Sequence, residues 1–254
     1  MILKEGLAAS VRLVAPSVLI LAGLALPALA GDRALFDPIG YSADGRYFAF
    51  EEFGIQDGSG FAYSNIYVID IPADAWAEGT PLRLRLEDEG QPMIAVREQN
   101  RAEAEPVLSG LEIAVPADIV ALIGDGEFDP EASALDFGLP GYGPGQVRES
   151  FTLGLETFDM PGARAGSEPC ETYLNASAQG YALTLAGDGE FRELHRDTRL
   201  PQSRGCVVTY RLHGVVLPMN AQDLDAALAI ISSYPFGFEG PDRRFLAVPL
   251  MNGR

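Results

Sequence analysis

Residues 41–71 read Tyr-Ser-Ala-Asp-Gly-Arg-Tyr-Phe-Ala-Phe-Glu-Glu-Phe, then Gly-Ile-Gln-Asp-Gly-Ser-Gly-Phe-Ala-Tyr, then Ser-Asn-Ile-Tyr-Val-Ile-Asp-Ile. The dipeptide Asp44-Gly45 predicts a tight turn, because Gly tolerates a positive φ and Asp can bond its own backbone. Aromatic and β-branched residues follow the turn and the loop, which predicts two strands. Phe48 and Phe50 alternate with Ala49 along the first strand. We therefore expect this strand to be covered on both faces.

Working outward, the sequence predicts more strands than helices. Period-two alternation predicts strands over 82–86 and 151–156, and the turn Gly187-Asp188-Gly189-Glu190 predicts a hairpin over 181–194. Further β-rich segments span 207–217, 228–234 and 245–250. Helix-forming residues over 93–111 predict a helix that Pro106 either kinks or divides, and 72–79 predicts one helical turn around Trp76.

These elements predict the α+β class, rich in β-structure, with mostly antiparallel sheets in a sandwich or partial barrel. No unit of about forty residues recurs, so a full propeller is not expected. Residues 44–49 and 242–247 share Asp, Arg, an aromatic residue and Ala at equal spacing. The sequence leaves open whether this is duplication or chance.

The first thirty residues have the pattern of an export signal. Lys4 and Arg12 precede an apolar stretch, and the small residues at 28–30 predict cleavage between Ala30 and Gly31. An uncleaved anchor is the alternative, because residues 13–30 are apolar almost throughout. We expect a signal peptide over 1–30, then a single β-rich domain over 31–254, periplasmic or secreted, with no membrane span after cleavage.

Charge restricts the function further. The chain has a net charge of −18, and after residue 30 every basic side chain is Arg. A strongly negative field disfavours nucleic acid and anionic lipid as partners. The absence of Lys from this part of the sequence excludes Schiff-base and Lys-nucleophile chemistry. Solubility alone also explains such an acidic chain.

The two cysteines of the chain are Cys170 and Cys206. In an exported protein an even pair predicts a disulfide. Free thiols or a metal pair are the alternatives, although two His in the whole chain offer little support for a zinc site. No cofactor is expected.

One stretch contains the residue types of a hydrolase: Glu193, His195, Asp197 and Ser203. Hydrolysis by a serine nucleophile requires the nucleophile, a base and an orienting acid to converge in space. The stretch lacks the Gly-x-Ser-x-Gly elbow that would present the serine. A polar loop without catalytic function is therefore the competing interpretation.

Four carboxylates at spacing two, Asp125, Glu127, Asp129 and Glu131, would share one face of an extended segment. Calcium binds clustered carboxylate oxygens, so these are candidate calcium ligands. The spacing is not that of an EF-hand loop, and a solvated acidic face is the alternative.

Five arginines are candidates for binding an anion: Arg196, Arg199, Arg204, Arg243 and Arg244. A guanidinium group can bind a carboxylate or a phosphate through two parallel hydrogen bonds. The alternative is that these side chains pair internally with acids such as Asp197 and Asp242, because so acidic a chain offers each of them many partners.

Two resemblances follow from these residues. The segments 42–46 and 65–70 resemble the strand pair of a TolB-type β-propeller repeat. The signal, the opening hairpin, the segment 200–206 and the segment 237–248 together resemble a family of predicted secreted bacterial proteins of unknown function. The second resemblance implies an exported protein and no particular activity.

The sequence therefore predicts a non-enzymatic interaction or binding module, with a protein or a small molecule of the cell envelope as its partner. The alternative is a hydrolase that uses His195, Asp197 and Ser203. Convergence of these three in a pocket would favour the enzyme, and internal pairing of the arginines would favour the module.

Overall fold

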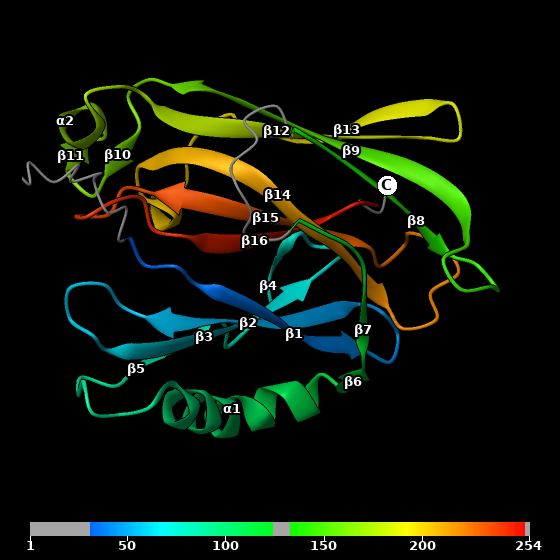
Figure 1. The fold of residues 1–254 in the computed structure, drawn as a ribbon, viewed down its shortest axis with the longest axis horizontal. Helices are drawn as coiled ribbons and strands as arrows, with labels where there is room; N and C mark the ends of the chain where they lie inside the picture. The colour runs from blue at the N-terminus through cyan, green and yellow to red at the C-terminus, as the bar shows by residue number, and fades with distance from the viewer. Residues whose placement is uncertain (1–30, 124–132, 252–254) are drawn as a thin grey trace, which may run out of the picture.

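The computed structural model describes residues 31–123 and 133–251. Three antiparallel sheets and one long helix are stacked in four layers (Figure 1). We call them the outer sheet, at the top of the figure, then the middle sheet, the helix-side sheet and helix α1 (Met93–Gly110). The described residues form no closed barrel or propeller, and their sheets are predominantly antiparallel, as the sequence predicts.

The helix-side sheet has the strand order β4-β3-β2-β1-β6, with β5 also paired to β3. Its strands are β1 (Leu35–Ser42), β2 (Tyr47–Ile55), β3 (Ala62–Asp70), β4 (Ala75–Trp76), β5 (Leu82–Arg85) and β6 (Ile113–Val115). Gly45 has a φ of 71° in the predicted Asp-Gly turn between β1 and β2. The hairpin is part of a six-stranded sheet and not of a propeller blade, and the TolB-type resemblance finds no support.

The middle sheet has the order β16-β15-β14-β7, and the outer sheet the order β13-β12-β9-β8. Their strands are β7 (Ala117–Leu122), β14 (Val207–Pro218), β15 (Leu228–Pro235), β16 (Arg244–Pro249), β8 (Ala134–Pro140), β9 (Val147–Met160), β12 (Ala178–Gly187) and β13 (Glu190–Arg196). Smaller elements are β10 (Arg164–Ala165), β11 (Glu168–Pro169), α2 (Glu171–Leu174) and the 3-10 turn η1 (Gln202–Arg204). The strands predicted from period-two patterns and the hairpin predicted from the Gly-Asp-Gly-Glu turn are therefore present.

Alternating side chains of the middle sheet enter two different cores. Ala229 and Ile231 of β15 pack into the core shared with the outer sheet. Leu228 and Ile230, which point the opposite way, pack against Phe48 and Phe50 of the helix-side sheet. Burial on both faces explains the continuous apolar run of β15, because neither face meets water. It also confirms that β2 is covered on both sides, since Ala49 lies in the core beneath α1.

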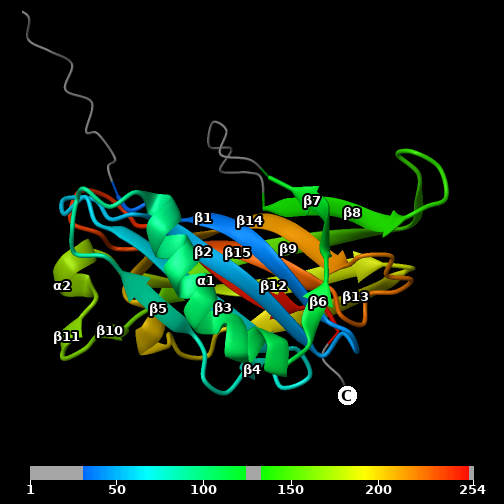
Figure 2. The same ribbon diagram turned by 90° about the horizontal axis from the view of Figure 1, so that it is seen from below.

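Helix α1 crosses the outer face of the helix-side sheet, as Figure 2 shows. Its buried residues recur at every fourth position: Val96, Asn100, Ala104 and Leu108. This spacing places them on one stripe, which meets Ile66 and Val68 of β3. The predicted helix is confirmed, and it continues through Pro106 as one element, so of the two alternatives at Pro106 a division into two helices does not occur.

The structure differs from the sequence-based expectation in the segment after β3, and it places the two similar segments of the chain. Residues 72–79 do not form a helical turn: Trp76 and Ala75 pair with Ile69 and Asp70 as strand β4, because the turn at residues 70–74 folds the chain back along β3. The two similar segments 44–49 and 242–247 begin β2 and β16, which lie in different sheets. They face each other through the core that Phe48 shares with Phe245.

Candidate functional site

The candidate site is a cavity of about 260 Å³ where the edges of all three sheets meet. Strands β4, β16 and β13 are terminal strands of the helix-side, middle and outer sheets. The cavity is lined by Asp74 and Trp76 at β4, by residues 245–248 of β16, and by His195 of β13. Tyr181 and Arg204 complete its polar wall. Residues as far apart in sequence as Phe50 and Val248 therefore line one cavity.

A hydrogen-bonded group fixes the polar wall around one carboxylate. Asp197 Oδ1 lies 2.9 Å from His195 Nε2, and Arg204 Nη1 donates to both Asp197 oxygens at 2.9 and 2.8 Å. The backbone N–H of Tyr181 donates to Asp197 Oδ2 at 3.0 Å. Burial by itself would raise the pKa of Asp197, but the hydrogen bond from His195 and the charge of Arg204 outweigh burial and lower that pKa. The carboxylate therefore stays ionised.

Aromatic rings hold this wall in place. The His195 ring stacks on Tyr181 with centroids 4.7 Å apart, and Tyr181 contacts Tyr210 at 4.8 Å. The guanidinium carbon of Arg204 lies 5.1 Å from the Tyr181 ring centroid. Burial raises the pKa of Tyr210 to about 12, so its phenol stays neutral beside Arg204. Rings on one side and Asp197 on another leave Arg204 little rotational freedom.

Two further lining residues, Asp74 and Trp76, were not identified as site residues from the sequence. Asp74 lies in the turn before β4 with a φ of 47°, a left-handed conformation that Asp adopts more readily than most residues. Trp76 is 47% exposed, and its ring lies 5.8 Å from that of Tyr67. A half-exposed Trp offers a ligand both an apolar ring face and an N–H donor. The one available signal was an Asp-Ala-Trp triplet directly after a strand, and we interpreted it as a helical turn.

The hydrolase residues converge only in part. His195 and Asp197 are hydrogen-bonded, as a base and an orienting acid would be. Ser203 is exposed in η1, does not line the cavity, and has no hydrogen bond to His195 among the described residues. Glu193 pairs with Arg196 at 2.8 Å on the exposed side of β13. The chain thus brings together two of the three groups that the serine mechanism requires.

The candidate arginines do not form one cluster. Arg196 pairs with Glu193 and Glu156, and Arg199 is exposed in the loop after β13. Arg204 belongs to the cavity, whereas Arg243 and Arg244 lie at the start of β16. Arg196 and Arg244 are therefore paired internally, as the alternative interpretation expects. Within the described part of the chain, Arg204 is paired through only one of its three nitrogens.

A second buried ion network surrounds Arg244. Its Nη2 donates to Asp32 at 3.0 Å, its Nη1 donates to Tyr63 Oη at 3.1 Å, and its Nε lies 3.8 Å from Glu52 Oε1. Glu52 also accepts the backbone N–H of Phe245 at 2.9 Å. Burial raises the pKa of Glu52, while the charge of Arg244 opposes that change.

Glu51, the neighbour of Glu52, is buried on the opposite face of β2. It accepts hydrogen bonds from Ser64 Oγ at 2.8 Å and from Arg97 Nε at 3.1 Å. Arg97 also contacts Asp37 and lies over the Phe53 ring, 3.7 Å from its centroid. The network ties α1 to the sheet. The sequence contained a signal for both carboxylates, because consecutive Glu residues in a strand covered on both faces must both point inward.

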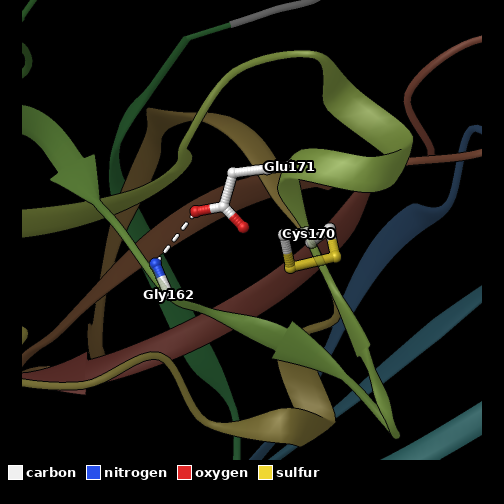
Figure 3. The surroundings of a disulfide bond; sticks show 4 residues. Gly162, Cys170 and Glu171 are labelled. Carbon is white, nitrogen blue, oxygen red and sulfur yellow. Dashed lines mark hydrogen bonds between the residues drawn. A yellow bond between two sulfur atoms is a disulfide. The ribbon is translucent and has the colours of Figure 1, made fainter.

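The predicted disulfide joins Cys170 and Cys206, with Cα atoms 5.3 Å apart. Figure 3 shows it at the start of α2, where Glu171 accepts a hydrogen bond of 2.9 Å from the backbone N–H of Gly162. Cys206 follows Arg204 by two residues, so the crosslink holds the segment that carries the polar wall. The two cysteines are therefore joined by a disulfide, and neither alternative, free thiols or a metal pair, describes them.

The calcium candidates Asp125, Glu127, Asp129 and Glu131 lie outside the described residues. Within 31–123 and 133–251, no group of three or more His, Cys, Asp or Glu side chains is placed to hold a metal ion. The same ranges contain no helix that is both long and apolar enough to span a membrane.

A larger and more open hollow, of about 700 Å³, lies beside the 54–60 loop. Its walls include Arg33, Glu89 and Gly31, the first described residue.

Fold and site together define a β-rich protein of three stacked sheets with a polar pocket at their common edge. Residues 49–251 match the model of a family described as predicted secreted protein (DUF2259), and this range covers most of the chain. The chain belongs to this family of predicted secreted proteins of unknown function. No curated protein matches the sequence. The disulfide is consistent with a location outside the cytoplasm.

Proposed function

We propose that the protein is a non-enzymatic binding module of the periplasm or the extracellular space, and that it holds a small molecule in the cavity between the three sheets. The observation that carries this proposal is the composition of the cavity wall. It combines a cation, a carboxylate and exposed aromatic surface in a volume of about 260 Å³. Ligand pockets combine apolar surface with a few placed polar groups in this way.

The hydrolase alternative has one observation in its favour, the His195–Asp197 hydrogen bond. The same bond has a structural explanation, because Asp197 also orders Arg204 and the Tyr181 backbone. Any hydrolytic activity detected in the purified protein would decide between the two: loss of that activity in His195→Ala would support the enzyme.

Binding can be measured directly, because Trp76 is the single Trp of the chain and lines the cavity. We would titrate the purified, cleaved and oxidised protein with the low-molecular-weight fraction of the cell envelope. We expect a saturable change in Trp76 fluorescence and a matching added mass in native mass spectrometry.

Two alanines provide a matched pair of variants. Ala247 and Ala117 are both half-buried against the same core, but only Ala247 lines the cavity. Ala247→Leu would fill the cavity, so it should abolish both signals, whereas Ala117→Leu should retain them. Binding that is equal in Ala247→Leu and in the unmodified protein, or no binding by the unmodified protein, would overturn the proposal.

A further inference from the structure

One edge of the Arg204 guanidinium has no protein partner. Nη1 is engaged by Asp197 and lies 3.5 Å from Tyr210 Oη. Among the described residues, Nε and Nη2 have neither a hydrogen bond nor an ion pair, although the side chain is only 14% exposed. These two nitrogens form the edge of a guanidinium that binds a carboxylate through two parallel hydrogen bonds.

A carboxylate without a partner among the described residues lines the same cavity. Asp74 shares the cavity lining with His195 and Arg204. Burial raises the pKa of Asp74, and the charges of His195 and Arg204 partly oppose that change. No hydrogen bond or ion pair joins the Asp74 side chain to either residue, nor to any other described side chain. Opposite charges therefore line one cavity without forming an ion pair.

The backbone of β16 supplies a further polar pair. Phe245 gives its N–H to Glu52 and not to β15, so residues 245 and 247 point their backbone groups away from the sheet. Ala247 lines the cavity and presents one N–H and one C=O. The aromatic wall, with Trp76 and Tyr67, lies beside these groups.

We propose that the ligand of this cavity is a free α-amino acid with an aromatic or large apolar side chain. Its carboxylate would bind the free edge of Arg204, its ammonium group would bind Asp74, and its side chain would lie against Trp76 and Tyr67. A zwitterion matches the two charges at once, and a cavity of about 260 Å³ admits one such molecule. This inference rests on the proposed function, because it names the class of small molecule that the cavity binds.

The test uses L-phenylalanine as the probe, with calorimetry and Trp76 fluorescence as readouts. Two analogues each lack one charge: 3-phenylpropanoate lacks the ammonium group, and phenethylamine lacks the carboxylate. We expect each analogue to bind at least about tenfold more weakly than L-phenylalanine, because each loses one charge-assisted contact.

Asp74→Asn isolates the ammonium contact, since Asn also tolerates the left-handed conformation. This substitution should weaken the binding of L-phenylalanine by about tenfold and leave the affinity for 3-phenylpropanoate unchanged. Asp188→Asn is the matched control, because Asp188 has a φ of 52° in the exposed turn between β12 and β13, away from the cavity. It should bind as the unmodified protein does.

The outcomes separate the two proposals. Equal binding of 3-phenylpropanoate and L-phenylalanine would overturn the role of Asp74 and with it the zwitterion. Another result is that L-phenylalanine does not bind while an envelope component still changes Trp76 fluorescence, and Ala247→Leu abolishes that change. In that case the amino-acid inference fails and the binding function stands. If neither binds, both fail.

Discussion

Arg204 and Arg244 are both largely buried, both paired with carboxylates, and both stacked near tyrosine rings. They differ in how many of their nitrogens have partners. All three nitrogens of Arg244 contact protein acceptors, whereas two of the three on Arg204 have none among the described residues. A saturated guanidinium can only stabilise the fold, while an unsaturated one at a cavity is available to a ligand. Residue type and burial alone do not distinguish the two roles.

The largest expected effect comes from truncating the saturated arginine. Arg244→Ala leaves the Glu52 and Asp32 carboxylates buried without their cation. We expect a loss of roughly 3 to 5 kcal/mol in the free energy of unfolding. Arg204→Ala should cost less, roughly 1 to 3 kcal/mol, because Asp197 keeps its bonds from His195 and the Tyr181 backbone.

Urea denaturation of both variants measures this difference. The exposed Arg199→Ala is the control and should change stability by less than about 0.5 kcal/mol. Equal losses of unfolding free energy in Arg204→Ala and Arg244→Ala would remove the distinction between a structural and a ligand-binding arginine.

The second effect concerns the crosslink beside Arg204. The Cys170–Cys206 bond closes a loop with a sequence separation of 36. Replacing both cysteines with Ala should cost roughly 3 to 4 kcal/mol by the chain-entropy estimate. Hydrogen exchange should rise mainly around residues 163–206, with the Arg244 network still protected. Uniform loss of protection across all three sheets would contradict this local role.

The smallest expected effect is a change of stability with pH that arises at Asp197. Its pKa is lowered in the folded protein, so its contribution to stability is complete above the unfolded value of about 3.9. That contribution should disappear as the pH falls from this value through the folded pKa. Thermal melts between about pH 5 and about pH 2 would show it, and the stability of Asp197→Asn should depend less on pH in this range. If stability falls with pH as steeply in Asp197→Asn as in the unmodified protein, Asp197 is not the source of the pH dependence.

Local pattern predicted most of the secondary structure, because strands and helices follow the spacing of apolar side chains. The helix-forming residues of 93–111 and the turn at 187–190 correspond to α1 and the β12–β13 hairpin. Residues 72–79 were interpreted wrongly, since pairing with β3 overrides the weak local preference there. The stacking of three sheets depends on contacts between distant segments, and period-two patterns contain no information about which faces meet.

The site was predictable only in part for the same reason. His195, Asp197 and Arg204 are close in sequence and were all identified, the first two as hydrolase candidates and Arg204 as an anion-binding candidate. Asp74 and Trp76 join them only because the ends of three sheets coincide. Glu51 and Glu52 show how a local rule misleads, because adjacent carboxylates normally indicate a surface. The expected coverage of β2 on both faces instead places both side chains inside, where they are buried.

The contact between the first described residues and the final strand has a consequence for synthesis. The backbone N–H of Asp32 donates to Asp242, which lies 210 residues later in the chain. A ribosome adding about 5 to 20 residues per second needs roughly 10 to 40 s to cover that distance. For all of that time the Glu52 carboxylate lacks Arg244 and the Phe245 N–H. The helix-side sheet, although made first, can therefore reach its final packing only after β16 has been synthesised.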